Sequence, residues 1–156
     1  MYSSRDYRET DFSSLELIYH DAVMGQGRRG YSDEQVQLWA AFPYLFRDDF
    51  SRLVRSGYTR VMTMHNIPVA FATLNPDHYL ALIYVLEQHS GRGLAGRLCE
   101  EMEQEARRRG VDCLTTDASV LSRPMFEQRG FRLLDQQQVH KAGETFTRYI
   151  MEKKLG

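Results

Sequence analysis

The chain has 156 residues, of which 42% are apolar and 26% are charged, and its formal net charge is −1. This length and composition predict one folded domain with its own core and argue against a disordered or membrane-spanning protein. The nearly balanced charge gives no reason to expect nucleic acid or an anionic membrane as a partner.

Targeting and metal signals are missing from the sequence. No apolar run approaches the roughly 20 residues of a membrane span. The first residues, MYSSRDYRETD, lack the apolar region of a signal peptide. Cys99 and Cys113 have no neighbour at CxxC or metal-ligand spacing, so we expect reduced thiols and no bound metal. A cytoplasmic location is the resulting prediction.

The chain begins with a predicted edge strand, Met1–Arg8, followed by a helix. Asp11 is expected to be the N-cap of this helix. The glycine-rich segment Gly25–Gly30 is expected to break it. Apolar residues recur at helical spacing on one of its faces, namely Leu15, Ile18, Tyr19, Ala22 and Val23.

Two further helices are predicted before the pattern changes. Ser32 is expected to cap the first of them, with Glu34 and Gln35 near the capping-box position. Leu45–Arg55 predicts the second, which ends at Gly57.

The remainder of the chain predicts a mixed α/β sheet. Its expected strands are Tyr58–Met64, Pro68–Leu74, Tyr79–Leu86, Val111–Thr116, Phe131–His140 and Phe146–Glu152. Leu94–Arg109 and Ser122–Arg129 are expected to be helices. This order gives a mostly antiparallel sheet with one parallel crossover in its middle, from Tyr79–Leu86 through Leu94–Arg109 to Val111–Thr116.

A glycine cluster follows the third of these strands and opens a helix. Gly91–Gly96 reads GRGLAG, and such a turn directs backbone N–H groups and the positive end of a helix dipole at one small volume. The site therefore suits a phosphate or diphosphate. The run also matches G-x-G-x-x-G, so a dinucleotide-binding fold is an alternative.

The position of the cluster opposes that alternative. Leu86–Ser90 separates the strand from the first glycine, whereas a Rossmann loop leaves its strand almost directly. Helices and antiparallel strands precede the motif, where the nucleotide fold would begin. Only about 40 residues follow Asp117, too few for the rest of that sheet.

The chain resembles the GNAT family of acetyl-CoA-dependent N-acetyltransferases. The run Ser90–Ala95 is similar to the family signature Gln/Arg-x-x-Gly-x-Gly/Ala, with Ser90 departing from Gln/Arg. The segment from Asp117 to Phe131 is similar to the family's second conserved region. Tyr31–Ala40 and Met151–Leu155 resemble the YafP-type branch of bacterial acetyltransferases. The resemblance implies the GNAT fold, with two central strands that splay apart.

The resemblance also implies acetyl-CoA as cosubstrate. Its diphosphate is expected on the glycine segment, and its arm is expected along the exposed edge of the strand before that segment. A backbone N–H there or at Leu86 is expected to polarise the thioester carbonyl. The positions implied in binding are Ile83, Tyr84, Val85, Gly91, Arg92, Gly93, Leu94, Ala95, Gly96, Ser119 and Phe126.

The catalytic groups are less well defined by the resemblance. Phe126 stands where many members carry a tyrosine acid, and a phenyl ring donates no proton. Asp117 and His78 are the candidates for the general base. Asp117 ends one predicted strand and His78 precedes another, and both strands lie beside the expected thioester. Acetyl transfer to a primary amine, on a small molecule or a peptide, is the predicted reaction. A catalytically silent acyl-CoA sensor is the alternative.

The acceptor is expected between the loop Gly25–Tyr31 and the hairpin turn Lys141–Phe146. Trp39, Phe42 and Tyr44 are expected at the edge of this groove. The resemblance also allows a homodimer across the C-terminal strands.

Overall fold

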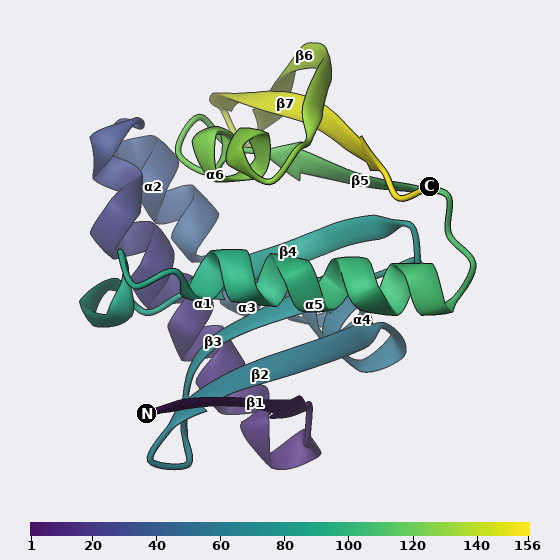
Figure 1. Cartoon of the computed structure of the whole chain (residues 1–156). Helices are drawn as coiled ribbons and strands as arrows, with labels where there is room; N and C mark the ends of the chain where they lie inside the picture. Colours follow the sequence, from purple (N-terminus) through teal and green to yellow (C-terminus); the bar gives the residue numbers. More distant parts are fainter.

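The computed structural model describes all 156 residues and contains one seven-stranded sheet, ordered β1-β2-β3-β4-β5-β7-β6 (Figure 1). The strands are β1 (Tyr2–Asp6), β2 (Tyr58–Met64), β3 (Ile67–Leu74), β4 (Tyr79–Val85), β5 (Cys113–Ala118), β6 (Arg132–Lys141) and β7 (Glu144–Lys154). Only β4 and β5 are parallel neighbours, so the predicted mixed sheet with one parallel crossover is confirmed.

Helices cover both faces of the sheet. They are α1 (Phe12–Gln26), α2 (Asp33–Ala40), α3 (Phe42–Leu45), α4 (Arg47–Ser56), α5 (Leu94–Arg108) and α6 (Arg123–Gln128). One core lies between the sheet and α1, α2 and α4, and a second lies between the sheet and α5 and α6. No helix is both long and apolar enough to cross a membrane.

The first helix has its predicted apolar face and its predicted ends, with Asp11 before it and the glycine-rich segment after it. The side chains of all five apolar positions are buried. Asp11 occupies the N-cap position of α1 as predicted, but its carboxylate makes no capping hydrogen bond, because it accepts the Arg8 N–H and pairs with Arg5 at 2.7 Å. The glycine-rich segment Gly25–Gly30 ends α1 as predicted, because the helix stops at Gln26 and Gly27–Arg29 form a 3-10 turn, while Gly25 itself lies inside α1. A Cβ at Gly25 would lie 2.7 Å from Glu87 Cβ, so this glycine permits a close approach within the helix.

The second and third predicted helices are both present. Ser32 Oγ accepts the Gln35 N–H and Gln35 Oε1 accepts the Ser32 N–H, which confirms the capping box of α2. The helix predicted over Leu45–Arg55 is α4, which begins two residues later than predicted and ends before Gly57 as predicted. Phe46 leaves helical geometry at φ −121° and ψ 50°, and separates α3 from α4.

The strand after α5 begins two residues later than predicted. Val111 donates its N–H to Ala106 O at 2.9 Å and so belongs to the C-terminal turn of the helix. β5 therefore runs from Cys113 to Ala118, and Asp117 lies within it opposite Ile150 of β7 rather than at its end.

The two central strands separate after a short contact. β4 and β5 are paired only at Tyr79 with Thr115 and at Leu80 with Thr116. Thr116 Oγ1 also donates to Leu80 O at 2.8 Å. Beyond this point β5, β7 and β6 lie apart from β4 together with α6 (Figure 1). The upper edge of β4 is left without a partner strand.

Candidate functional site

The free edge of β4 exposes the backbone of alternate residues. In an antiparallel pair, hydrogen-bonded residues alternate with residues whose N–H and C=O point away. Leu86 N–H donates to Val69 O of β3 at 2.9 Å, so Tyr84 also faces β3, whereas Ile83 and Val85 face the gap. Gln26 reaches Val85 O from α1 with its Nε2 atom at 3.3 Å.

This alternation decides which of the predicted backbone contacts on β4 are available to a ligand. Leu86 N–H is already used by Val69, so the expectation that it polarises a thioester carbonyl is wrong. The backbone groups of Ile83 and Val85 are the ones directed at the gap. Tyr84 lies beside the gap through its side chain instead.

The glycine segment leaves its N–H groups unpaired. Gly91 and Gly93 have φ of 74° and 79°, values that favour glycine. A Cβ at either position would meet nothing within 4 Å, so the space above the loop is open. The backbone N–H groups of residues 91–96 donate no hydrogen bond within the protein, and no acidic side chain lies in the first turn of α5. The segment therefore presents backbone N–H groups that have no partner in the protein, and such groups suit an anion.

The other residues of the segment fill different places. Arg92 is exposed and donates to Tyr2 OH at 2.8 Å. Leu94 is buried, which anchors the start of α5 in the core. Ala95 lines the adjoining cavity, and a Cβ at Gly96 would lie 3.8 Å from Arg129 Nη1.

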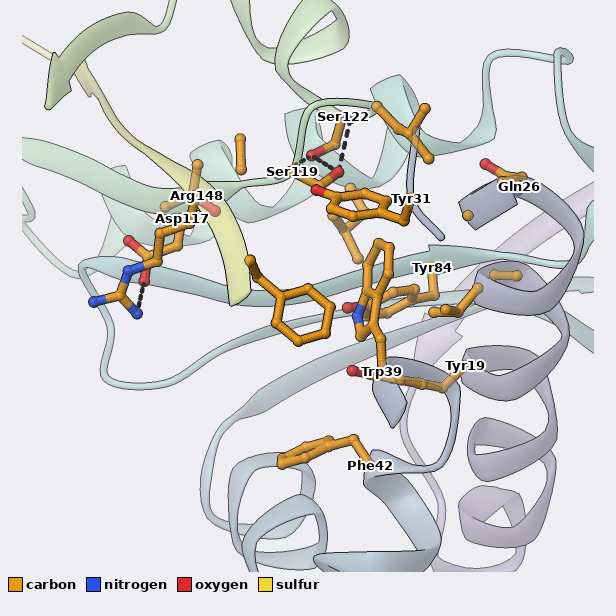
Figure 2. Close-up of a pocket in the computed structure, with 18 of the residues that line it drawn as sticks. Tyr19, Gln26, Tyr31, Trp39, Phe42, Tyr84, Asp117, Ser119, Ser122 and Arg148 are labelled. Atoms are coloured by element: carbon orange, nitrogen blue, oxygen red, sulfur yellow. Dashed lines mark hydrogen bonds and ion pairs between the residues drawn. The ribbon is translucent and has the colours of Figure 1, made fainter. Parts of the chain in front are cut away.

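A cavity of about 490 Å³ opens between the separated strands and α1, α2 and α6. Figure 2 shows Trp39 near its centre, between Tyr31 and the Tyr19–Tyr84 pair. The rings of Tyr19 and Tyr84 lie 4.2 Å apart, and those of Tyr31 and Trp39 lie 5.3 Å apart. Aromatic side chains therefore pack on one another to form its wall.

Burial raises the pKa of both Tyr19 and Tyr84 above the ordinary value of a phenol. Each phenol is therefore protonated at neutral pH and is a hydrogen-bond donor in the cavity.

Hydroxyl groups gather where β5 ends. Ser119 Oγ lies 3.1 Å from Ser122 Oγ, and each hydroxyl accepts the other residue's N–H (Figure 2). Tyr31 OH accepts the Val120 N–H at 3.2 Å. Ser119 therefore shapes the turn before α6 as well as facing the cavity.

Asp117 is the one carboxylate that lines the cavity. It accepts a hydrogen bond from Tyr79 OH at 2.8 Å and lies 3.3 Å from Arg148 Nη1. Burial and the carboxylate of Asp117 raise the pKa of Tyr79 well above its usual value, so this phenol stays protonated and donates. Figure 2 shows Asp117 and Arg148 at the side of the cavity away from Tyr84.

The structure brings most predicted site residues together but separates His78 from them. Ile83, Tyr84, Val85, Ala95, Asp117, Ser119 and Phe126 all line the same cavity. The side chain of His78 is 57% exposed, lies near Asp77 and does not line the cavity. Phe126 is buried and packs edge-on against Phe131.

Sequence reasoning missed Tyr19, Gln26 and Arg148 as lining residues. Gln26 continues the apolar face of α1 by one turn beyond Ala22 and Val23, a spacing that was available in the sequence. Arg148 carried no such signal, because its contact with Asp117 exists only once β7 pairs with β5.

The sequence matches known proteins over most of its length. The family model of the acetyltransferase (GNAT) domain matches residues 28–153. The uncharacterised N-acetyltransferase YafP of Escherichia coli K12 is 28% identical over 150 residues, which cover 96% of this chain and 94% of that protein.

Two N-acetyltransferases are among the solved structures to which this chain is similar. A GCN5-related N-acetyltransferase from Rhodopseudomonas palustris superposes with a TM-score of 0.92 and 26% identity, covering 97% of this chain and 94% of that one. The PaiA N-acetyltransferase from Thermoplasma acidophilum, solved in complex with coenzyme A, has a TM-score of 0.78 and 16% identity over 99% of both chains.

Proposed function

The chain belongs to the GNAT acetyltransferase family, and we propose that it transfers the acetyl group of acetyl-CoA to a primary amine. The observation that carries this proposal is the free edge of β4. That edge runs past the cavity toward the unpaired N–H groups of residues 91–96. The N–H groups would bind a diphosphate, and the free strand edge would bind a long arm that carries amides.

The residues present fit coenzyme A. The open space above Gly91 and Gly93 and the unused N–H groups suit a diphosphate. The backbone groups of Ile83 and Val85 suit the amides of the arm, because a peptide-like chain binds a free strand edge by main-chain hydrogen bonds. Bound acetyl-CoA supplies an acetyl thioester, whose acetyl group passes to the amine nitrogen as the thiol is released.

The chain's own groups would assist this transfer by hydrogen bonding and proton transfer. A backbone N–H of Ile83 or Val85 would stabilise negative charge on a carbonyl oxygen in the gap. Asp117 would accept the proton that the ammonium group must lose, directly or through water. Tyr79 and Arg148 hold its carboxylate in place. Phe126 donates no proton, so the donors that remain in the cavity are hydroxyls such as those of Tyr84 and Ser122.

A thiol-release assay with a panel of amines, together with a calorimetric titration with coenzyme A, tests the proposal. We expect saturable binding of coenzyme A and thiol release that depends on the amine. Absence of binding would contradict the proposal. Saturable binding without turnover on any amine would favour the sensor alternative, which Phe126 and Ser90 keep open because both depart from the family pattern.

Replacing Asp117 with asparagine tests its role. Asparagine preserves an acceptor for Tyr79 OH but accepts no proton, so kcat should fall on the order of 100-fold while the Kd for coenzyme A stays unchanged. Asp77→Asn is the matched control, since Asp77 lies outside the cavity beside His78. A loss of activity in Asp77→Asn and not in Asp117→Asn would assign the base to the start of β4.

A further inference from the structure

One wall of the cavity is formed mainly by aromatic rings. Its rings come from several elements. Tyr19 lies on α1, Trp39 on α2 and Phe42 on α3, and Phe46 directly follows α3. Phe146 lies on β7. The Phe146 ring lies 6.1 Å from that of Tyr31. Such a wall favours an apolar body and disfavours a strongly hydrated chain, whose polar groups would lose water without finding partners.

The charges of the lining are few and unequal. They are Asp117, Arg148 and Lys141. Asp117 and Arg148 form an ion pair and so largely cancel each other. Lys141 makes no ion pair, and its Nζ lies over the rings of Phe42 and Phe46 at 5.0 and 4.4 Å. One positive charge is thus left beside the aromatic wall, where it favours an anionic group on a ligand.

The hairpin turn also limits the size of the ligand. Lys141 links the end of β6 to α3, and Gln35 Nε2 of α2 donates to Thr145 O at 2.6 Å. These two contacts tie the turn between β6 and β7 to the helices beside the cavity. A volume of about 490 Å³ that is also shared with the thioester arm leaves room for a small molecule rather than for a folded protein surface.

We propose that the amine acceptor is a small amino acid-like molecule with an aromatic or branched apolar body and a carboxylate that binds Lys141. This inference rests on the proposed acetyl transfer and names its substrate class. Its amine would lie toward Asp117 and the gap, and its apolar body would lie against Trp39 and Phe146. Polyamines, which carry several positive charges and no carboxylate, would be excluded by the same charge.

A comparison of L-phenylalanine, phenethylamine and spermidine as acceptors tests this assignment. Phenethylamine keeps the ring and amine of phenylalanine and lacks only its carboxylate. We expect KM for phenylalanine to be about tenfold lower than KM for phenethylamine, and no turnover of spermidine. Lys141→Met should raise KM for phenylalanine about tenfold and leave KM for phenethylamine unchanged. Lys141→Arg should restore the wild-type KM for phenylalanine.

Lys154→Met is the matched control, because Lys154 lies at the end of β7 and does not line the cavity. Calorimetric binding of phenylalanine to protein saturated with coenzyme A gives a second reading that needs no turnover. Preference for phenethylamine or spermidine, or a Lys141→Met variant that behaves as wild type, would overturn the inference. A protein that turns over other amines but neither binds nor acetylates phenylalanine or leucine would overturn it and leave the proposed acetyl transfer standing.

Discussion

The two ends of α5 carry the same backbone feature with different surroundings. At the N-terminal end Gly93 has φ 79°, and at the C-terminal end Gly110 has φ 77°. A Cβ at either glycine would meet nothing within 4 Å. The first-turn N–H groups donate to nothing in the protein, and no acid lies among them.

The C-terminal end is completed by the chain itself. Val111 N–H donates to Ala106 O at 2.9 Å, and Gly110 N–H donates to Arg107 O at 3.0 Å. Arg108 and Arg109 add positive charge where the helix dipole is negative. One end of the helix thus has its own partners, whereas the N–H groups at the other end have none in the protein and are assigned to coenzyme A in the proposed function. An αL glycine is therefore structural or functional according to what its neighbouring N–H and C=O groups bind.

The largest expected effect comes from placing an acidic side chain beside the unpaired N–H groups at the N-terminal end of α5. Gly96→Asp places a carboxylate in the first turn of α5, where it interacts favourably with the helix dipole and lies near Arg129. The free protein should gain about 1 kcal/mol, which raises Tm by about 2–4 °C. The same charge repels a diphosphate, so the Kd for coenzyme A should rise on the order of 100-fold.

Gly96→Ala separates these two consequences. It removes the helix-weakening glycine and should raise Tm by a similar amount. Because it adds no charge, its Kd for coenzyme A should stay within about tenfold of wild type. Scanning calorimetry and isothermal titration measure the two quantities. If Gly96→Asp bound coenzyme A as tightly as Gly96→Ala, the diphosphate would not lie at this end of the helix.

The second prediction compares the two glycines directly. Alanine at φ near 80° costs roughly 1–2 kcal/mol, so Gly93→Ala and Gly110→Ala should lower Tm by similar amounts. Only Gly93→Ala places a methyl group above the open N–H groups, so only this variant should weaken coenzyme A binding, by about tenfold. Equal affinity in the two variants would make Gly93 a helix cap and nothing more.

The sequence predicted best where structure depends on neighbouring residues. β2 has its predicted bounds, and α5 ends one residue from its predicted end, because periodicity and the glycine after the helix are local signals. The side-chain capping role of Asp11 and the strand assignment of Val111 were wrong, although the partners of both residues are close in sequence. Asp11 pairs with Arg5, and Val111 donates its N–H to Ala106 O, and apolar periodicity describes neither contact.

The same distinction divides the functional site. The glycine segment is local, and its open geometry agrees with its sequence motif. The cavity wall is assembled from side chains of several helices and strands, so its lining residues were only partly foreseen. The parity of β4, which directs Ile83 and Val85 into the gap, required the register with β3. β4 begins at its predicted residue, Tyr79, so the exposure of the His78 side chain outside the cavity was not the result of a misplaced strand.

The smallest expected effect lies at the closed end of α5. Glu105 accepts hydrogen bonds from Arg108 and Arg109, which lower the pKa of its carboxyl from 4.5 to about 2. A folded-state pKa below the unfolded value means that the interaction stabilises the protein above about pH 5 and is lost as pH falls toward 2. Glu105→Gln should therefore lower stability at pH 7 by no more than about 1 kcal/mol, because Arg108 is largely exposed to water.

Thermal unfolding of wild type and Glu105→Gln between pH 7 and pH 2 measures this contribution. The difference in Tm should be a few degrees at pH 7 and should vanish toward pH 2. The Kd for coenzyme A should not change, since Glu105 lies at the end of the helix that binds no ligand in the proposed function. A Glu105→Gln variant with weakened coenzyme A binding would show that the two ends of α5 are coupled, which would contradict their assignment as one structural and one functional end.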